Sequence, residues 1–138
     1  MTQISYALHA ALLAFAALSA APAFAQQPAV IDLNSAAQAG SACRLTFTVT
    51  AQQGLSELQT QTVLFDQEGG VQTFTLFDFG AIPSQGLRVR QFDMPQTNCD
   101  DISMVLFNDV SICNATDGSA CTVTPTFSSR LDAVEVQQ

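Results

Sequence analysis

Residues 43–50 read Cys-Arg-Leu-Thr-Phe-Thr-Val-Thr, and this stretch decides the fold. Its apolar side chains occupy every second position and alternate with arginine or threonine, which is the period of a β-strand with one buried face. Valine and threonine are also favoured in strands, because branched side chains suit a pleated surface. The stretch therefore predicts an antiparallel strand that covers a hydrophobic core on one side.

Six further segments carry strand signals, at residues 58–65, 71–79, 87–92, 101–112, 121–127 and 131–136. The turn Asp66-Gln67-Glu68-Gly69-Gly70 is typical of a hairpin, since its glycines can adopt positive φ. A bulge is expected near Asn108-Asp109. Short strands at regular spacing, without a helical period, predict an all-β fold: a small immunoglobulin-like antiparallel β-sandwich of six or seven strands. The phenylalanines beyond residue 25 are expected to fill its core: Phe47, Phe65, Phe74, Phe77, Phe79, Phe92, Phe107 and Phe127.

The first 25 residues have the pattern of a secretory signal peptide. An apolar run ends before Ala23-Phe24-Ala25, which offers small residues to a signal peptidase, and we expect cleavage after Ala25. The run is too short for a membrane span, so the processed chain is not expected to cross a membrane. We expect a periplasmic protein with an N-terminal arm over residues 26–42 and the sandwich over residues 43–138.

Four cysteines in an exported domain predict two disulfides, for which three pairings are possible. Cys113 and Cys121 flank a turn-rich segment with Asp117-Gly118 near its middle, so a bridge that closes this short loop is favoured. That bridge leaves Cys43 to pair with Cys99. A redox pair would need a Cys-x-x-Cys spacing, which the sequence lacks.

The composition excludes most catalytic chemistry. Beyond residue 25 the sequence has no histidine, lysine, tyrosine or tryptophan. A serine would therefore lack a base to activate it, and no Gly-x-Ser-x-Gly motif is present. The net charge of −8 repels nucleic acid, which proteins bind through lysine and arginine. We expect a protein that is not an enzyme, needs no cofactor and binds no nucleic acid.

The segment from Leu76 to Asp93 is the densest in charged and aromatic residues. If its two strands pair as a hairpin, Asp78 faces Arg88, and Arg90 lies two residues further along on the same side. One interpretation is an ordinary exposed ion pair of little energetic weight. The other is a partner-binding face, formed by Asp78, Arg88, Arg90 and Asp93, that presents an arginine fork to a carboxylate or a partner protein.

Two acidic segments offer oxygen ligands of the kind that calcium prefers. They are Asp66-x-Glu68-Gly69-Gly70 and Asn98 with Asp100-Asp101. Neither matches the twelve-residue EF-hand loop, and no metal ligand is assigned. They leave open a carrier of calcium or of a small ligand as the alternative to an adaptor.

One stretch carries a resemblance to known proteins. FDFGAIPSQGLRVRQFDMPQTNCDDISMVLFNDVSIC, with the upstream CRLTFTVTA and VLFDQEG, resembles a group of small exported alphaproteobacterial proteins of unknown function. The resemblance covers about residues 30–136. More loosely, LFD followed by an acidic-glycine turn is similar to FxLYD-type immunoglobulin-like domains of the bacterial envelope, which implies a sandwich with an interaction role. The resemblance also associates the chain with ExbB–ExbD energy-coupling systems.

These observations favour a non-catalytic periplasmic accessory or adaptor domain that binds another envelope protein. The missing catalytic residues exclude most enzyme mechanisms, and the sandwich offers sheet edges and the Asp78/Arg88/Arg90 face for binding a protein. The alternative is a periplasmic module that carries a small ligand or Ca²⁺.

Overall fold

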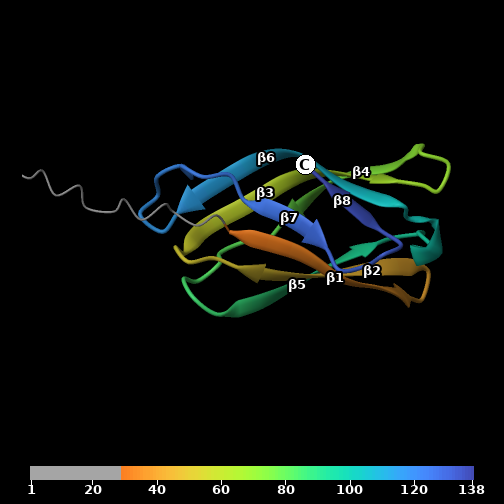
Figure 1. Cartoon of the computed structure of the whole chain (residues 1–138), viewed down its shortest axis with the longest axis horizontal. Helices are drawn as coiled ribbons and strands as arrows, with labels where there is room; N and C mark the ends of the chain where they lie inside the picture. Colours follow the sequence, from red (N-terminus) through yellow and green to blue (C-terminus); the bar gives the residue numbers. More distant parts are fainter. Residues whose placement is uncertain (1–28) are drawn as a thin grey trace, which may run out of the picture.

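The computed structural model describes residues 29–138, and the predicted signal peptide lies outside the described residues. Two sheets of four strands pack face to face as a β-sandwich (Figure 1), which confirms the predicted fold class with eight strands in place of six or seven. The strands are β1 (Val30–Ala39), β2 (Ala42–Thr50), β3 (Leu55–Phe65), β4 (Val71–Asp78), β5 (Leu87–Met94), β6 (Met104–Ala115), β7 (Thr126–Ser129) and β8 (Glu135–Gln137), and a short 3₁₀ helix, η1 (Cys99–Asp101), precedes β6.

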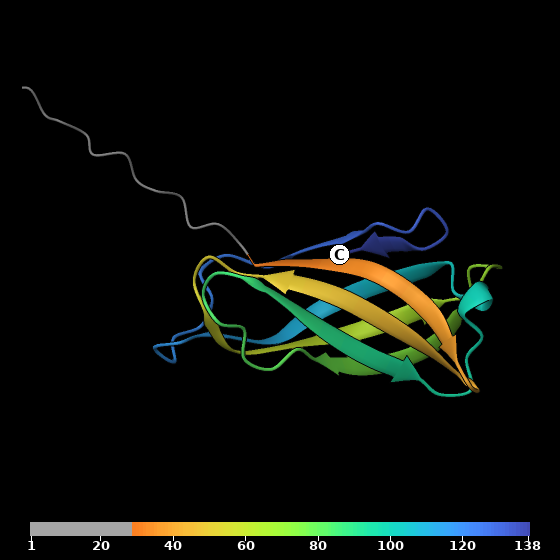
Figure 2. The same cartoon turned by 90° about the horizontal axis from the view of Figure 1, so that it is seen from below.

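The two sheets are called A and B here. Sheet A has the strand order β5-β2-β1-β7, and sheet B has the order β4-β3-β6-β8. Neighbouring strands run antiparallel, except that β7 lies parallel to β1 and β8 parallel to β6. Figure 2 shows β1, β2 and β5 side by side as one layer. No helix within residues 29–138 has the length and hydropathy that crossing a membrane requires.

The core lies between the sheets, and β2 supplies its centre. The four apolar residues in the alternating stretch 43–50 are fully buried, which confirms the predicted strand and its inner face. The ring of Phe47 lies in an aromatic cluster, with the ring centroids of Phe77, Phe79, Phe92 and Phe107 at 5.7 to 6.0 Å. These edge-to-face contacts favour one arrangement of the rings and so help to fix how the two sheets pack.

Six of the eight phenylalanines pack in or against this core. The expectation that all eight do so is wrong for Phe65 and for Phe74, and Phe74 is 61% exposed. Phe74 lies opposite Val63 on the outer face of sheet B. Phe65 follows Val63 on that same face of β3 and is half-buried.

The predicted N-terminal arm is wrong where the structure describes it, because β1 occupies Val30–Ala39. This strand lies inside sheet A, between β2 and β7, and Ile31 and Leu33 are fully buried. Its later residues are mostly alanine, serine and glutamine, which have little intrinsic preference for strands. Neighbouring strands on both sides stabilise β1, and a register shift between Leu33 and Ser35 interrupts its pairing with β2.

The segment between β4 and β5 crosses from sheet B to sheet A and does not form a hairpin. The expected pairing of Asp78 with Arg88 is therefore wrong. Asp78 pairs with Gln59 of β3, whereas Arg88 pairs with Val49 of β2. We call residues 79–86 the crossover.

Backbone bonds to β3 explain why the chain does not turn back on itself after β4. The N–H of Phe79 donates to the carbonyl of Leu58 at 2.9 Å. Ile82 then exchanges two backbone bonds with Leu55, at 2.7 and 2.9 Å. Phe79 and Ile82 are fully buried, so the crossover is part of the core. Gly80 between them has a φ of 62°, which glycine adopts without steric cost.

The C-terminal strands agree in part with the sequence pattern. The bulge expected near Asn108-Asp109 is present, because Thr62 pairs with Phe107 but Gln61 pairs with Asp109. The strands expected over residues 121–127 and 131–136 are shorter, and only β7 and β8 form there. Pro125 has no N–H to donate, and β7 begins after it.

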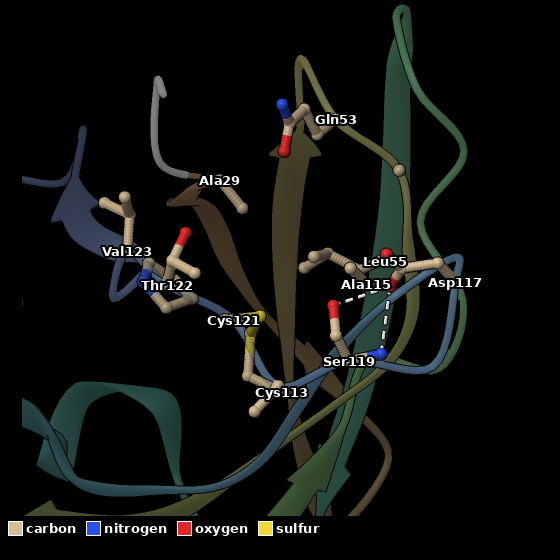
Figure 3. Close-up of a pocket in the computed structure, with 13 residues that line it drawn as sticks. Ala29, Gln53, Leu55, Cys113, Ala115, Asp117, Ser119, Cys121, Thr122 and Val123 are labelled. Atoms are coloured by element: carbon tan, nitrogen blue, oxygen red, sulfur yellow. Dashed lines mark hydrogen bonds between the residues drawn. A yellow bond between two sulfur atoms is a disulfide. The ribbon is translucent and has the colours of Figure 1, made fainter. Parts of the chain in front are cut away.

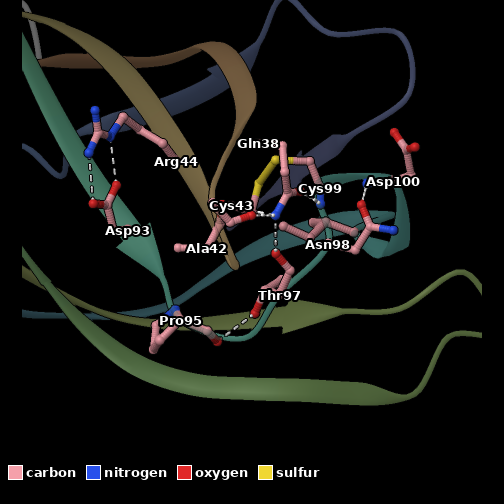
Figure 4. Close-up of a disulfide and its surroundings, with 12 residues drawn as sticks. Gln38, Ala42, Cys43, Arg44, Asp93, Pro95, Thr97, Asn98, Cys99 and Asp100 are labelled. Atoms are coloured by element: carbon pink, nitrogen blue, oxygen red, sulfur yellow. Dashed lines mark hydrogen bonds and ion pairs between the residues drawn. A yellow bond between two sulfur atoms is a disulfide. The ribbon is translucent and has the colours of Figure 1, made fainter.

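Both predicted disulfides are present. The Cα atoms are 4.9 Å apart in Cys43–Cys99 and 5.4 Å apart in Cys113–Cys121. Beside the first bridge (Figure 4), the Gln38 side chain accepts the N–H of Cys99 at 3.0 Å and donates to the carbonyl of Thr97 at 3.2 Å. Gln38 thus holds the chain that leads to η1 against the end of β1.

Candidate functional site

The four residues predicted to form a partner-binding face lie around the crossover, but they do not form one cluster. Asp78 ends β4 in sheet B, whereas Arg88, Arg90 and Asp93 belong to β5 at the edge of sheet A. Arg88 and Arg90 share the inner side of β5, and Asp93 lies on its outer side, because alternate strand residues point to opposite faces. All four side chains form a hydrogen bond within the chain, and those of Arg90 and Asp93 bind partners outside their own strand.

Arg90 holds the crossover in place. Its Nε donates to the carbonyl of Phe79 at 2.7 Å, and its Nη2 donates to the carbonyl of Ala81 at 2.8 Å. No backbone N–H of residues 29–138 outside the regular strand pairing binds the carbonyls of Phe79 and Ala81, and a charged donor binds a carbonyl more strongly than a neutral one. Arg90 therefore has a structural role that ties the edge of sheet A to the chain leaving sheet B.

Asp93 forms an ion pair with Arg44 on the outer face of sheet A (Figure 4). Nε and Nη2 of Arg44 donate to the two carboxylate oxygens at 2.7 and 2.8 Å. The residues also pair across β2 and β5. The hydrogen bonds from Arg44 lower the pKa of the Asp93 carboxyl, and the attraction between the opposite charges lowers it further.

Arg88 and Asp78 stay exposed. Nη1 of Arg88 donates to the carbonyl of its neighbour Leu87 at 2.9 Å, and within residues 29–138 no carboxylate pairs with it. One Asp78 oxygen accepts the N–H of Gly80 at 2.8 Å, which supports the turn into the crossover. Of the predicted face, these two side chains remain available to a partner.

The structure shows an exposed apolar surface that the sequence reasoning missed. Phe74 and Leu76 on β4 are 61% and 58% exposed, and both lie on the outer face of sheet B. They adjoin Val63 of β3, which pairs with Phe74 and with Leu106 of β6. Val63 is only 6% exposed although it lies outside the main core. We call Val63, Phe74, Leu76 and Leu106 the outer patch.

A signal for this patch is present in the sequence of β4. In Thr-Phe-Thr-Leu-Phe-Asp-Phe, the residues 74, 76 and 78 fall on one side of a strand and 73, 75, 77 and 79 on the other. Both sides carry phenylalanine, so at least one phenylalanine had to face outward. The expectation that every phenylalanine is a core residue therefore cannot hold for β4.

The free edge of β4 lies directly beside the outer patch. Phe79 and Leu58 form a hydrogen-bonded pair, and such pairs alternate along an antiparallel ladder. Residues 73, 75 and 77 therefore direct their backbone groups to β3. Phe74 and Leu76 direct their N–H and C=O groups to the open edge, where a further strand can bind.

The other sheet edges are protected in ways that β4 is not. β7 and β8 are only four and three residues long. β5 carries Arg88, Arg90 and Asp93, and charged side chains discourage another strand from pairing. β4 has eight residues, and its only charged residue is Asp78 at the last position. Of the four edges in residues 29–138, the edge of β4 is therefore the least protected.

A small pocket lies at the end of the sandwich that carries the Cys113–Cys121 loop (Figure 3). Its volume is about 130 Å³, and Ala29, Leu55 and Val123 contribute apolar walls. Such a volume is below the range of ordinary small-molecule sites. Asp117 lines it, but its carboxylate accepts the N–H and the hydroxyl of Ser119 at 2.9 and 2.6 Å. The hydroxyl bond chiefly lowers the pKa of Asp117.

The two acidic segments considered for calcium do not converge on a site. Within residues 29–138, no three histidine, cysteine, aspartate or glutamate side chains come together as metal ligands. In the hairpin turn, one Asp66 oxygen accepts the N–H groups of Glu68 and Gly70 at 3.1 and 2.7 Å. In the other segment, Asn98 accepts the N–H of Asp100 at 3.3 Å and caps η1. Both sets of residues stabilise turns.

Comparison with known proteins bears on the fold. No protein-family model matches this sequence, and no curated protein sequence matches it. A solved structure of IrmA from Escherichia coli is similar, with a TM-score of 0.53 and 11% sequence identity. The match covers 80% of this chain and 92% of the IrmA chain. At this level of identity, the similarity shows a shared sandwich fold.

Proposed function

We propose that this protein is a non-catalytic accessory module of the cell envelope that binds another envelope protein. The observation that carries the proposal is the open edge of β4, where free backbone groups lie beside exposed Phe74 and Leu76. Proteins commonly bind an extended segment by adding it as a strand to such an edge, and side chains beside the edge select the segment.

The two disulfides support export. Disulfides persist in oxidising compartments such as the bacterial periplasm and are rare in the cytosol. With the predicted cleavage after Ala25, we place the protein in the periplasm. We also retain the group of small exported alphaproteobacterial proteins as its proposed relatives, with an ExbB–ExbD-type system as a candidate partner.

The predicted face contributes to this surface in a reduced form. We assign structural roles to Arg90 and Asp93, because Arg90 binds two backbone carbonyls of the crossover and Asp93 pairs with Arg44. Asp78 and Arg88 lie exposed at the crossover end of β4, where they contact a bound partner. The binding surface is then the edge of β4, flanked by these two side chains.

Photo-crosslinking in the native host tests the proposal. Amine-reactive reagents are unsuitable, since the sequence has no lysine. A photoreactive residue is placed at position 76, at position 88 and, as a control, at exposed Val123, two residues beyond the Cys113–Cys121 loop. We expect one envelope protein to crosslink from positions 76 and 88 but not from 123. Equal yields from all three positions, or no adduct from position 76, would contradict the proposal.

The small pocket favours a second candidate function, carriage of a very small ligand. A ligand that binds only the folded protein must raise its thermal stability by mass action. We expect a shift in Tm only for molecules of a few heavy atoms, and we expect none for Ca²⁺. A calcium-dependent shift that a chelator reverses would instead support the calcium carrier.

A further inference from the structure

The two ends of the β4 edge differ in charge, and this difference describes the segment that binds there. At the hairpin end, Asp66 and Glu68 lie in the turn that precedes β4. The side chain of Gln67 donates to the carbonyl of Asp100 at 3.0 Å and so places η1, with Asp100 and Asp101, beside the same turn. Four acidic residues therefore lie toward this end of sheet B, with Asp66 and Glu68 on the hairpin itself and Asp100 and Asp101 across β3, where η1 leads into β6.

Within residues 29–138, no arginine forms an ion pair with any of these four carboxylates, although Arg130, which pairs with Asp32, lines the same hollow as Asp100. Within residues 29–138 the ion pairs are Arg44–Asp93 and Arg130–Asp32, and neither includes a carboxylate of the hairpin end. At the opposite end, Arg90 binds the carbonyl of Phe79, the residue that follows Asp78, so charges of both signs lie there. Between the two ends, residues 71–77 are uncharged. The edge thus presents an acidic end, an apolar middle and a mixed end.

We propose that the β4 edge binds an extended segment of a cationic partner protein, with apolar residues at alternate positions and lysine or arginine at one end. Its apolar side chains cover Phe74 and Leu76, and its basic residues lie beside Asp66 and Glu68 of the hairpin turn. This inference rests on the proposed function, because it describes the partner at the same edge.

Charge and area both argue against a second copy of this chain as the occupant. Each copy has a net charge of −8, so two copies repel each other at low ionic strength. The exposed parts of Val71, Phe74 and Leu76 offer roughly 300 Å² of apolar surface per copy, below the about 450 Å² of apolar surface that each partner buries in a stable interface. A flexible cationic segment gains from the acidic end as well as from the edge.

Synthetic peptides test the inference. All probes share a core of seven residues in which valine alternates with threonine. One peptide has two lysines at its amino end, and a second has two lysines at its carboxyl end. The control peptides carry two glutamates in place of the two lysines. Binding is followed by NMR of the backbone amides, together with a measured Kd. We expect the better lysine peptide to shift the amides of Phe74 and Leu76 and to bind at least about tenfold more tightly than the glutamate peptide at low salt. This ratio should shrink as salt screens the charges.

Protein variants supply the matched controls. Glu68→Gln should weaken binding of the lysine peptide, whereas Glu57→Gln, which removes the same charge at the opposite end of β3 from the hairpin turn, should weaken it less. Leu76→Pro removes an N–H that points to the open edge without removing a bond to β3, and it should abolish binding. If Leu76→Pro does not fold, Phe74→Ser serves the same purpose, because it keeps the backbone and removes the apolar contact.

Each outcome decides the inference. Equal binding of the lysine and glutamate peptides, or unshifted Phe74 and Leu76 amides, would overturn it. A concentration-dependent dimer that Leu76→Pro abolishes would assign the edge to a second copy and also overturn it. Crosslinking of an envelope protein from position 76 would support the proposed function in either case, so the two failures can be told apart.

Discussion

The Nε atom of Arg90 and the carbonyl oxygen of Phe79 lie 2.7 Å apart, and this bond joins the edge strand of sheet A to the chain that leaves sheet B. The neighbouring bond to Ala81 extends the same contact along the crossover. An arginine that looked from the sequence like a binding residue is thus part of the support for the sandwich. Within residues 29–138, the side chain of Arg88, two residues earlier, has one hydrogen bond, to the carbonyl of its neighbour Leu87, which makes it a natural control.

Arg90→Met should destabilise the protein by about 1.5–3 kcal/mol, because two carbonyls lose a charged donor. Arg88→Met should change the stability by less than about 0.5 kcal/mol, as is usual for exposed positions. Urea unfolding of both variants measures the difference. Equal effects would show that the bonds of Arg90 to the crossover contribute nothing.

Local patterns made much of the fold predictable. The alternation in β2, the glycine-containing turn after β3 and the short Cys113–Cys121 loop each depend on residues close in sequence, and all three predictions are confirmed. The period of a strand shows which side is buried but not which strand lies next to it. The crossover was mistaken for a hairpin for that reason.

The rest depended on contacts between distant residues. β1 has few residues that favour a strand, and its neighbours on both sides hold it in the sheet. Arg90 supports the crossover by binding two of its backbone carbonyls. Where those carbonyls lie depends on the folded chain, so the spacing of residues in the sequence cannot predict this role. Of the predicted face, Asp78 and Arg88 keep exposed side chains, while the edge of β4 adds Phe74 and Leu76.

The pair formed by Arg44 and Asp93 predicts a pH dependence of stability. The pKa of Asp93 is lower in the folded protein than its unfolded value of about 4. A carboxylate whose pKa is lowered by folding stabilises the fold at pH values above its pKa in the unfolded chain. This contribution is lost as the pH falls through its pKa in the folded protein. Above about pH 4, the free energy of unfolding of the wild-type protein should therefore exceed that of the Asp93→Asn variant. The two free energies should converge at lower pH.

Urea unfolding between about pH 2 and 6 at low salt measures this convergence, because salt weakens an exposed pair. In the Arg44→Gln background, the change in the free energy of unfolding caused by Asp93→Asn should depend much less on pH. A difference between wild type and Asp93→Asn that stays constant with pH would contradict the assignment of the shift to Arg44.

The two disulfides should differ in their effect on stability. Cys43 and Cys99 are 56 residues apart, and Cys113 and Cys121 are 8 apart. In the chain-entropy model, the first bridge contributes about 4 kcal/mol and the second about 2.5 kcal/mol, because the longer loop restricts the unfolded chain more. Unfolding of the two double Cys→Ala variants compares them. A larger loss on removing Cys113–Cys121 would show that the chain-entropy model fails here.

The buried hydroxyls of Thr60 and Thr62 give the last prediction. Both residues are fully buried on the inner face of β3, and their oxygens are 3.0 Å apart. Thr60→Val or Thr62→Val alone should cost about 1–2 kcal/mol, because the remaining hydroxyl loses this partner in an apolar interior. The double variant replaces both groups with methyls of similar shape and should cost less than the two single changes added together. Urea unfolding of the three variants gives the coupling energy. Additive losses would show that each hydroxyl relies on another acceptor, such as a carbonyl of its own strand, and that their mutual bond is incidental.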